Sequence, residues 1–353
     1  MHSIQTTVQS SPKRILIIRL SSIGDIILAT PVPRNLKNKF PAVELDFIVK
    51  KQFAALLHGN PYIDHILPLD TGGGRRELAR LKNQLQARNY DLVVDIHNNL
   101  RSHYLKAGLP GIKVTYKKYA FRRFLLVKFG WNLFRTIIPV TRRYLDSLAT
   151  FGITDDRLGP QVFIDPTTLQ RMDKLLQDKG LETTRPVICM APGAGFFTKR
   201  WPVEYFTQIA ECCIKVLNAQ IVLLGNTQDQ QLTRQIIIQL ADKSALDLAG
   251  TLEIMETAAV MNRADLVVSN DSGLMHLAAA LKKKTVAVFG STTRELGFFP
   301  DNPLARVMEN NDLPCRPCSH IGRKKCPKQH FKCMRDILPD TVFQAVRELL
   351  KNE

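Results

Sequence analysis

Residues 269–273, Ser-Asn-Asp-Ser-Gly, form a polar turn between an apolar run at 264–268 and another at 277–281. The first run is predicted to be a strand and the second a helix. Ligands of parallel α/β sheets bind where a strand leads into a helix, and the N–H groups of a helix amino terminus attract anions. The turn is therefore a candidate phosphate-binding site, and its candidate contacts are Asp271, Ser272, Gly273 and His276. A helix cap at Asp271 or Ser272, with His276 half-buried, is the structural alternative.

A second polar turn, residues 20–25, follows a predicted strand at 14–20 and opens a predicted helix. It lacks the G-x-G-x-x-G pattern, so it does not support a dinucleotide site. Asp25 is placed at the helix start, where a carboxylate can serve as a general base. A first-turn Asp that only stabilises the helix dipole is the alternative.

A third turn, residues 193–202, begins with Gly193-Ala194-Gly195 and contains Lys199-Arg200 just before a predicted helix. Backbone N–H groups in a glycine loop, together with a lysine, suit a diphosphate. The spacing does not fit the Walker A pattern, so a P-loop is not predicted.

Strand-like and helix-like segments that must position these turns alternate along the chain. Strands are predicted at 14–20, 43–49, 63–69, 90–95, 186–190, 220–225, 264–268 and 285–289. This βαβ rhythm predicts α/β domains with parallel sheets covered by helices. The helix at 25–40 should kink at Pro31 and Pro33. A domain boundary is expected between residues 155 and 185, so two α/β halves should face a cleft.

The net charge of +17 is concentrated between residues 101 and 143, a stretch that has no Asp or Glu. Its cations are Arg101, Lys106, Lys113, Lys117, Lys118, Arg122, Arg123, Lys128, Arg135, Arg142 and Arg143. Aromatic residues interrupt them, including Phe121, Phe124, Phe129 and Trp131. The stretch should attract a polyanion, which is nucleic acid, an anionic membrane surface or a phosphorylated substrate. A solvated basic face without a partner is the alternative.

The chain has 45% hydrophobic residues and no apolar stretch that approaches the length of a membrane helix. Its start is polar and has no signal-peptide core, so a cytoplasmic location is expected, with residues 1–12 as a loose tail. Four cysteines lie close together near the end: Cys315, Cys318, Cys326 and Cys333. Reduced thiols are expected there, and a zinc site is the weaker alternative because the second pair lacks a short spacing.

Four ordered motifs together resemble the ADP-heptose:lipopolysaccharide heptosyltransferases, glycosyltransferase family 9, over almost the whole chain. The motifs are residues 17–25, residues 199–202, residues 271–276 and the terminal cysteines. The resemblance implies a GT-B fold with two Rossmann-like domains. These would be an acceptor domain at 1–165, a donor domain at 166–335 and a last helix, 336–353, that crosses back to the first domain.

The resemblance also implies an inverting transfer of heptose from ADP-heptose to the inner core of lipopolysaccharide, without a metal or other cofactor. Asp25 matches the catalytic base, Lys199 matches the lysine on the donor diphosphate, and Asp271, Ser272, Gly273 and His276 match the donor-binding block. Ser272 stands where some members have Thr. His276 either touches the donor or only braces the turn. Weaker candidates for acceptor contacts are Ser22, Gly24, Arg101 and Ser102.

The basic stretch would then dock the enzyme on the anionic cytoplasmic face of the inner membrane. Three other functions stay open: a related enzyme that uses another nucleotide sugar, a family member that binds the donor without transfer, and a nucleic-acid-binding protein. No known nucleic-acid module is present in the sequence, so nucleic acid is not the expected partner.

Overall fold

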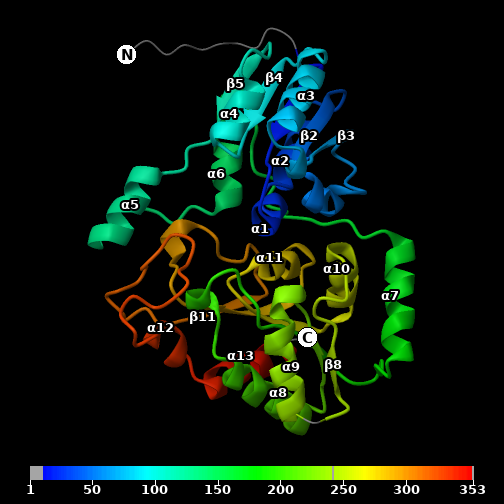
Figure 1. The fold of residues 1–353 in the computed structure, drawn as a ribbon, viewed down its shortest axis with the longest axis vertical. Helices are drawn as coiled ribbons and strands as arrows, with labels where there is room; N and C mark the ends of the chain where they lie inside the picture. The colour runs from blue at the N-terminus through cyan, green and yellow to red at the C-terminus, as the bar shows by residue number, and fades with distance from the viewer. Residues whose placement is uncertain (1–10, 241, 352–353) are drawn as a thin grey trace. The chain divides into compact units, whose positions relative to one another are not determined.

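The computed structural model describes residues 11–240 and 242–351, which divide into two compact units (Figure 1). Unit 1 holds the described residues up to Lys118 together with Val140–Phe163, and unit 2 holds Tyr119–Pro139 and the described residues from Ile164 onward. The predicted boundary at 165 is two residues away from this division, but the assignment of 119–139 to the second unit was not predicted. Most of the predicted tail, residues 1–10, lies outside the described residues.

Unit 1 is built on a five-stranded sheet in the order β3-β2-β1-β4-β5, with every pair of neighbours parallel. The strands are β1 (Arg14–Ile18), β2 (Glu44–Lys50), β3 (His65–Leu69), β4 (Leu92–Asp95) and β5 (Ile112–Thr115). Strand β1 is central and almost wholly buried, as its run of branched apolar residues predicts for a parallel sheet covered on both faces.

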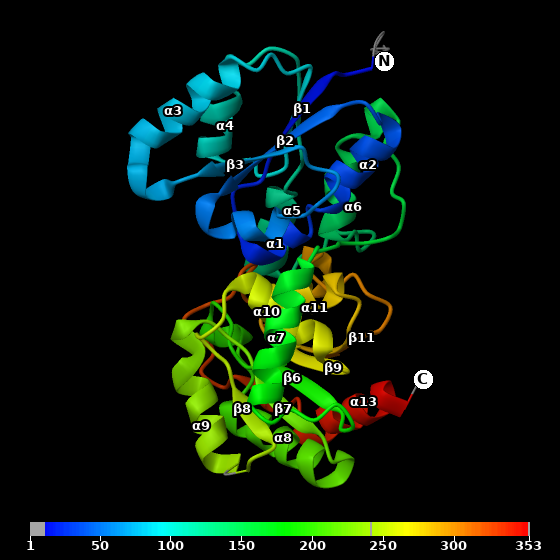
Figure 2. The same ribbon diagram turned by 90° about the vertical axis from the view of Figure 1, so that its right-hand side faces the viewer.

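Helices cover both faces of this sheet: α3 and α4 pack together, as do α2 and α6, and Figure 2 shows the two pairs on opposite sides. The helices are α1 (Ile23–Ile27), α2 (Pro31–Lys39), α3 (Gly74–Gln86), α4 (Leu100–Lys106) and α6 (Val140–Asp146). Short 3₁₀ turns occupy Lys51–Leu57, Thr71–Gly73 and Ala149–Phe151. The predicted break in the first helix is confirmed, since α1 ends at Ile27 and α2 begins at Pro31.

A buried arginine ties the returning segment Val140–Phe163 to unit 1. Arg34 on α2 is 1% exposed and makes a two-pronged ion pair with Asp156, with Nε–Oδ2 and Nη2–Oδ1 distances of 2.6 and 2.7 Å. The same guanidinium donates to Gln161 and to the carbonyl of Gly159. Such a pair fixes the planar orientation of both groups, which explains why a segment so distant in sequence belongs to this unit.

Unit 2 is built on a six-stranded parallel sheet in the order β11-β10-β9-β6-β7-β8. Its strands are β6 (Val187–Ala191), β7 (Gln220–Leu223), β8 (Ala245–Asp247), β9 (Leu266–Asn270), β10 (Lys284–Phe289) and β11 (Ala305–Glu309). Its helices are α5 (Ala120–Phe129), α7 (Pro166–Asp178), α8 (Val203–Leu217), α9 (Gln230–Leu240), α10 (Ile254–Arg263), α11 (Gly273–Ala280), α12 (Lys332–Arg335) and α13 (Pro339–Lys351). The 3₁₀ turns of this unit are Phe197–Lys199, Thr227–Asp229 and Arg294–Leu296.

The last helix, α13, is part of the core of unit 2. It packs against α8 and the neighbouring strands, and its buried residues Val342, Val346 and Leu349 join Phe206 and Ile209 in one apolar cluster. The structure therefore places α13 in the second unit. The crossing of residues 336–353 to the first domain stays a prediction.

Both sheets have the strand order of a Rossmann-like fold, so the predicted α/β class with two such sheets is confirmed. In each sheet, successive strands are added first on one side of the starting strand and then on the other. This reversal of the strand order lies between β1 and β4 in unit 1 and between β6 and β9 in unit 2. Ligands of open parallel sheets bind beyond the carboxyl ends of those strands. Among the described residues, no helix is both long and apolar enough to cross a membrane.

Candidate active site

Asp25 lies in unit 1 just beyond the carboxyl end of β1, where the strand order reverses. Its Oδ1 is 2.5 Å from Nη2 of Arg19, and its Oδ2 accepts from the Ser22 backbone N–H at 3.0 Å and the Ser22 hydroxyl at 2.9 Å. The side chain keeps 19% of its surface exposed. Asp25 is thus a fixed carboxylate that a ligand can still reach.

Burial alone would raise the pKa of Asp25, but the Arg19 guanidinium and the two Ser22 donors outweigh it and lower the pKa below its ordinary value. The carboxylate is therefore ionised near neutral pH and ready to accept a proton. Arg19 is itself buried; it donates to the carbonyl of Ile96 at 2.6 Å and lies over the ring of Tyr144. Sequence reasoning gave Arg19 no role, because a single arginine at a strand end carries no distinctive signal.

The loop after β4 lies at the same reversal point and contains His97. Burial, and then the charges of Arg19 and Lys118, lower the pKa of His97 to about 4, so its ring is neutral near neutral pH. The ring Nε2 is 2.7 Å from the Asn99 amide. His97 is a neutral polar group close enough to feel the charges of Asp25 and Arg19, and the sequence gave no signal that singled it out.

Of the other acceptor candidates, Ser22 is exposed beside Asp25, whereas Gly24 is buried inside α1. Ser102 has no exposed surface; its hydroxyl donates to Asp95 at 2.9 Å and closes the cap of α4. The Ser102 hydroxyl therefore stabilises the loop after β4. Because it has no exposed surface, it is not placed to contact an acceptor as predicted.

Arg101, in contrast, is exposed and lines a cavity of about 620 Å³ together with Arg75, Asp70 and Tyr104. The cavity lies where β3 ends and α4 begins. Two arginines and an aromatic ring in one hollow provide cationic contacts for an anion and a flat surface for a sugar ring.

In unit 2, Lys199 and Asp271 meet at the corresponding reversal point between β6 and β9. Lys199 Nζ is 2.7 Å from Asp271 Oδ2, and the Thr292 hydroxyl donates to the same oxygen at 2.6 Å. Asp271 is 4% exposed, so Lys199 and Thr292 stabilise a buried carboxylate. The structure brings together two residues that were predicted from separate motifs, and it adds Thr292, which follows the next strand.

The amino terminus of α11 begins directly after Asp271. Ser272 is the N-cap residue but its side chain makes no capping hydrogen bond, and Gly273 is the first residue of the helix. The first N–H groups of a helix have no partner within the helix. The alternative in which Ser272 or Asp271 serves only as a cap is therefore not what the structure shows. His276 is 5% exposed and packs edge-on against Phe298, so it lies inside the unit behind the turn.

The glycine loop after β6 has two glycines with different surroundings. A Cβ added to Gly193 would lie 2.2 Å from the Asp229 carboxyl carbon, whereas one added to Gly195 would meet no atom within 4 Å. Gly193 is thus required by close packing against Asp229, and only Gly195 leaves its backbone open. Arg200 does not point away from the loop, because its Nε donates to the carbonyl of Ala194.

The four terminal cysteines are free and lie around one cavity of about 350 Å³ that also includes His330. Among the described residues, no three of these thiols lie within the 4.8 Å spacing that would suit metal ligands. Cys315 Sγ lies 3.8 Å from His330 Nε2. Burial raises the pKa of Cys318, and it raises that of Cys333 to about 12, which favours the neutral thiols. The weaker zinc alternative therefore has no preassembled site.

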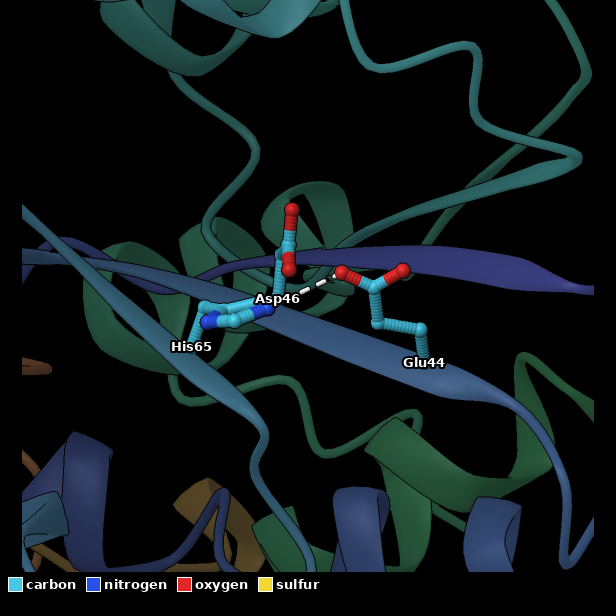
Figure 3. Close-up of side chains that lie close together, drawn as sticks. All are labelled: Glu44, Asp46 and His65. Carbon is cyan, nitrogen blue, oxygen red and sulfur yellow. Dashed lines mark hydrogen bonds and ion pairs between the residues drawn. The ribbon is translucent and has the colours of Figure 1, made fainter.

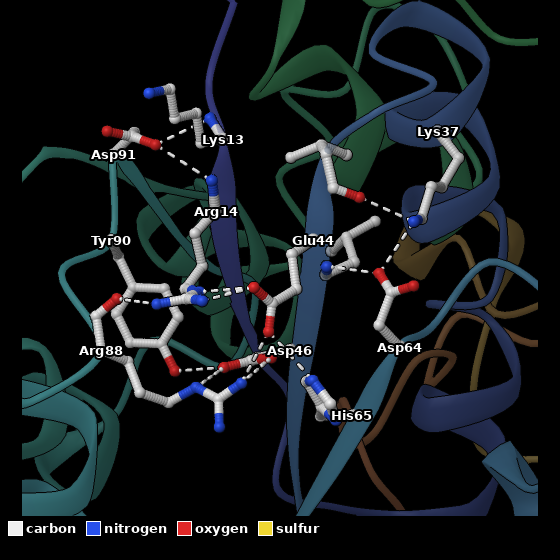
Figure 4. A network of polar contacts seen from close by, with 12 residues as sticks. Lys13, Arg14, Lys37, Glu44, Asp46, Asp64, His65, Arg88, Tyr90 and Asp91 are labelled. Carbon is white, nitrogen blue, oxygen red and sulfur yellow. Dashed lines mark hydrogen bonds and ion pairs between the residues drawn. The ribbon is translucent and has the colours of Figure 1, made fainter.

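A group that does have ligand spacing is Glu44, Asp46 and His65 in unit 1 (Figure 3). Its carboxylates already have cationic partners: Arg14 binds Glu44 at 2.5 Å, and Arg88 binds Glu44 and Asp46 at 2.9 and 2.7 Å (Figure 4). Glu44 and His65 are the first residues of their strands. The group thus lies at the amino ends of the strands, opposite the edge where ligands bind, and it is an ion-pair network that supports the fold.

Replacing Arg88 with Leu should reduce the stability of the protein by about 3–5 kcal/mol, because Asp46 is fully buried and would lose its cationic partner. Burial already raises the pKa of Asp46, and loss of Arg88 raises it further. Asp46 in the folded variant then binds a proton more readily than in the unfolded chain. The loss of stability relative to the wild type should therefore be largest near neutral pH and should shrink as pH falls. Urea unfolding at two pH values measures this difference.

The matched control is Arg80→Leu, which breaks an exposed ion pair with Glu77 on α3 and should leave the unfolding midpoint unchanged. Equal stability of Arg88→Leu and the wild-type protein would show that the network does not hold the sheet edge.

Comparison with known proteins identifies the family. Residues 78–331 match the sequence profile of glycosyltransferase family 9 (heptosyltransferase). Lipopolysaccharide heptosyltransferase 2 of Salmonella typhimurium is 27% identical over 96% of this chain and 99% of its own length. Among solved structures, a family 9 glycosyl transferase from Veillonella parvula has a TM-score of 0.81 at 23% identity, covering 97% of this chain and 98% of its own. The structure of E. coli ADP-heptose lps heptosyltransferase II has a TM-score of 0.73 at 22% identity, covering 96% of this chain and 98% of its own.

These likenesses extend over nearly the whole chain, and the solved structures share its two Rossmann-like sheets, which is the GT-B fold that was expected. The match covers the α11 turn and both residues of the Lys199–Asp271 pair. The chain therefore belongs to glycosyltransferase family 9, the heptosyltransferases, and is a glycosyltransferase.

Proposed function

We propose that this enzyme transfers heptose from ADP-heptose to the inner core of lipopolysaccharide, with inversion at the anomeric carbon and without a metal ion. The Lys199–Asp271 pair beside the open amino terminus of α11 carries the proposal. This arrangement offers a cation and unpaired N–H groups to a diphosphate, where a metal-dependent enzyme would use a divalent ion. Two of the relatives named above are by name a lipopolysaccharide heptosyltransferase and an ADP-heptose lps heptosyltransferase, which supports the choice of substrates.

In this mechanism Asp25 removes the proton from an acceptor hydroxyl as the oxygen attacks the anomeric carbon of the donor. The bond from that carbon to the diphosphate oxygen breaks, and ADP leaves with the electron pair. Negative charge therefore grows on the diphosphate in the transition state. Lys199 and the N–H groups at Ser272 and Gly273 stabilise that charge, while Asp271 holds Lys199 in place.

The acceptor would be bound by unit 1. The cavity lined by Arg75 and Arg101 suits the anionic groups of an inner-core acceptor, and Tyr104 suits one of its sugar rings. Because the acceptor is attached to lipid at the inner membrane, the enzyme would act at the cytoplasmic face of that membrane.

Transfer from ADP-heptose to truncated lipopolysaccharides of defined structure tests the proposal. We expect one acceptor to be extended by a single heptose, with the linkage at the new anomeric carbon inverted relative to the donor and with full activity in EDTA. Turnover with a UDP-sugar in place of ADP-heptose would favour the related nucleotide-sugar enzyme. A retained anomeric configuration or loss of activity in EDTA would contradict the mechanism.

A further inference from the structure

The segment Tyr119–Pro139 of unit 2 exposes large apolar side chains to an unusual degree. Phe121, Phe124 and Phe129 on α5 are 69%, 55% and 54% exposed, and Trp131 just after the helix is 62% exposed. Leu133 and Ile137, farther along the same segment, are 47% and 54% exposed. Scattered apolar residues are common on protein surfaces, but contiguous groups of this kind mark places where another molecule binds.

Three of these rings contact one another on the surface. Phe124 and Phe129 meet edge to face with their centroids 6.0 Å apart, and Phe129 and Trp131 are 5.4 Å apart. Gly130 ends α5 in the left-handed conformation and so turns Trp131 back toward the helix. The aromatic cluster is therefore assembled before any partner arrives.

The same segment carries exposed cations. Arg122, Lys128 and Arg135 belong to the same segment and are exposed. Lys128 and Phe129 also line the cavity of about 350 Å³ with Arg323 and Lys328, so the end of α5 adjoins the loop 323–328, Arg-Lys-Lys-Cys-Pro-Lys (Figure 1). Neither residues 119–139 nor residues 313–335 contain an Asp or Glu. A carboxylate from elsewhere in the unit, Glu295, accepts from the Asn132 amide at the edge of this surface.

Not every cation of the basic stretch contributes. Lys106 is buried and pairs with Asp95 at 2.7 Å, Arg143 is buried, and Arg142 pairs with Asp146. Arg101, Lys113 and Lys117 are exposed but belong to unit 1. The surface is therefore narrower than the predicted one and consists of residues 119–139 with the loop 323–328, called the aromatic–basic surface below.

We propose that the aromatic–basic surface docks on a bilayer that contains anionic phospholipid. Aromatic rings prefer the headgroup region of a bilayer, and lysines and arginines near the surface are attracted to its negative charge. The aliphatic side chains of Leu133 and Ile137 favour a lipid over a nucleic acid, because they offer no ring on which a base can stack. The proposed function gives a reason for the contact, since a lipid-linked acceptor lies in such a bilayer, but the docking does not depend on the transfer reaction.

Trp131 is a built-in reporter of this docking. The chain has two tryptophans, and the other, Trp201, is 2% exposed and donates to the carbonyl of Ile337. Vesicles of phosphatidylcholine with phosphatidylglycerol should shift the emission of the full chain to shorter wavelength, and brominated lipid should quench it. The variant Trp131→Phe should lose both signals. High salt should weaken binding, and pure phosphatidylcholine should bind far less.

Paired variants separate the two contributions. Arg122→Gln with Arg135→Gln should reduce binding to anionic vesicles roughly 25-fold, since each cation near the surface contributes a factor of about five. Phe124→Ser with Phe129→Ser should reduce binding at least as much, without changing its salt dependence. The controls are Arg234→Gln and Ile238→Ser, which alter one exposed cation and one 69% exposed apolar residue on α9 and should bind as the wild type does.

Several results would overturn the docking proposal. One is equal binding to neutral and anionic vesicles, or equal loss in the α9 controls. Another is the absence of binding to vesicles together with a shift of Trp131 emission when RNA is added. A third is the absence of binding to vesicles together with a shift of Trp131 emission when sedimentation shows that the chain forms a dimer. Transfer to a water-soluble, deacylated acceptor is measured in parallel and should be unchanged in all the surface variants. If the wild type shows no transfer but binds vesicles through Trp131, the proposed function fails while the docking stands.

Discussion

The variant Asp25→Asn should lose about 10³-fold in the rate of heptosyl transfer, because an amide cannot accept the proton of the acceptor hydroxyl. Binding of ADP-heptose should persist, since the proposed donor contacts all come from unit 2. Single-turnover kinetics measures the rate, and calorimetric titration with ADP-heptose measures binding. Turnover near that of the wild type would exclude Asp25 as the base.

The surroundings of Asp25 demand a folding control for this variant. The carboxylate accepts from Arg19 on one oxygen and from Ser22 on the other, and the amide of Asn must turn its NH₂ toward one of these donors. Ser22→Ala removes the hydroxyl contact and leaves the carboxylate and the Ser22 backbone N–H contact in place. It should reduce transfer only modestly, so a loss as large as that of Asp25→Asn would point to disrupted local structure.

The pH profile gives an independent readout of the base. Arg19 lowers the pKa of Asp25, so the wild-type kcat/KM should show no loss from this group as pH falls from neutrality toward the ordinary range of an aspartate. In Arg19→Met the cation is gone and burial raises the pKa of Asp25. The acid limb should then move to higher pH, whereas Arg19→Lys should keep it low. Identical pH profiles of kcat/KM in Arg19→Met and Arg19→Lys would contradict a role for Asp25 in proton transfer.

The elements of this fold could be predicted from sequence because apolar runs and prolines are local signals. Asp25 and Asp271 follow such a run near a predicted strand end, and Lys199 ends the glycine loop that comes after another. What the sequence could not provide was their partners. Arg19 contacts Ile96, and Thr292 contacts Asp271, although each pair is far apart in the sequence. The local alternation of apolar and polar residues does not predict such contacts.

The same limit applies to the membership of segments in the two units. Residues 119–139 join unit 2 and α13 packs against α8 through contacts between segments that are far apart in the chain. Ser102 looked available beside Arg101, yet helical geometry turns one outward and directs the other to the buried Asp95. The sequence also leaves open whether α11 is capped by a side chain, because Ser is a common N-cap residue and only its hydrogen bonds show whether it caps the helix.

The variant Lys199→Met should reduce kcat/KM for ADP-heptose by about 10²-fold or more, because it removes a cation from the charge that develops on the leaving diphosphate. Lys199 also has a second role, since it is the counter-ion of the buried Asp271 at 2.7 Å. A loss of activity in the single variant could therefore come from the unpaired carboxylate rather than from the missing diphosphate contact. The single variant should also be less stable, as expected when one partner of a buried pair is removed.

The double variant Lys199→Met with Asp271→Asn separates these two roles. Asparagine keeps the acceptor oxygen for the Thr292 hydroxyl and carries no charge, so stability should recover toward that of the wild type. If Lys199 binds the diphosphate, kcat/KM for the donor should stay low in the double variant although its unfolding midpoint recovers. Recovery of both would mean that Lys199 serves only to neutralise Asp271, and the open amino terminus of α11 would then have to hold the diphosphate alone.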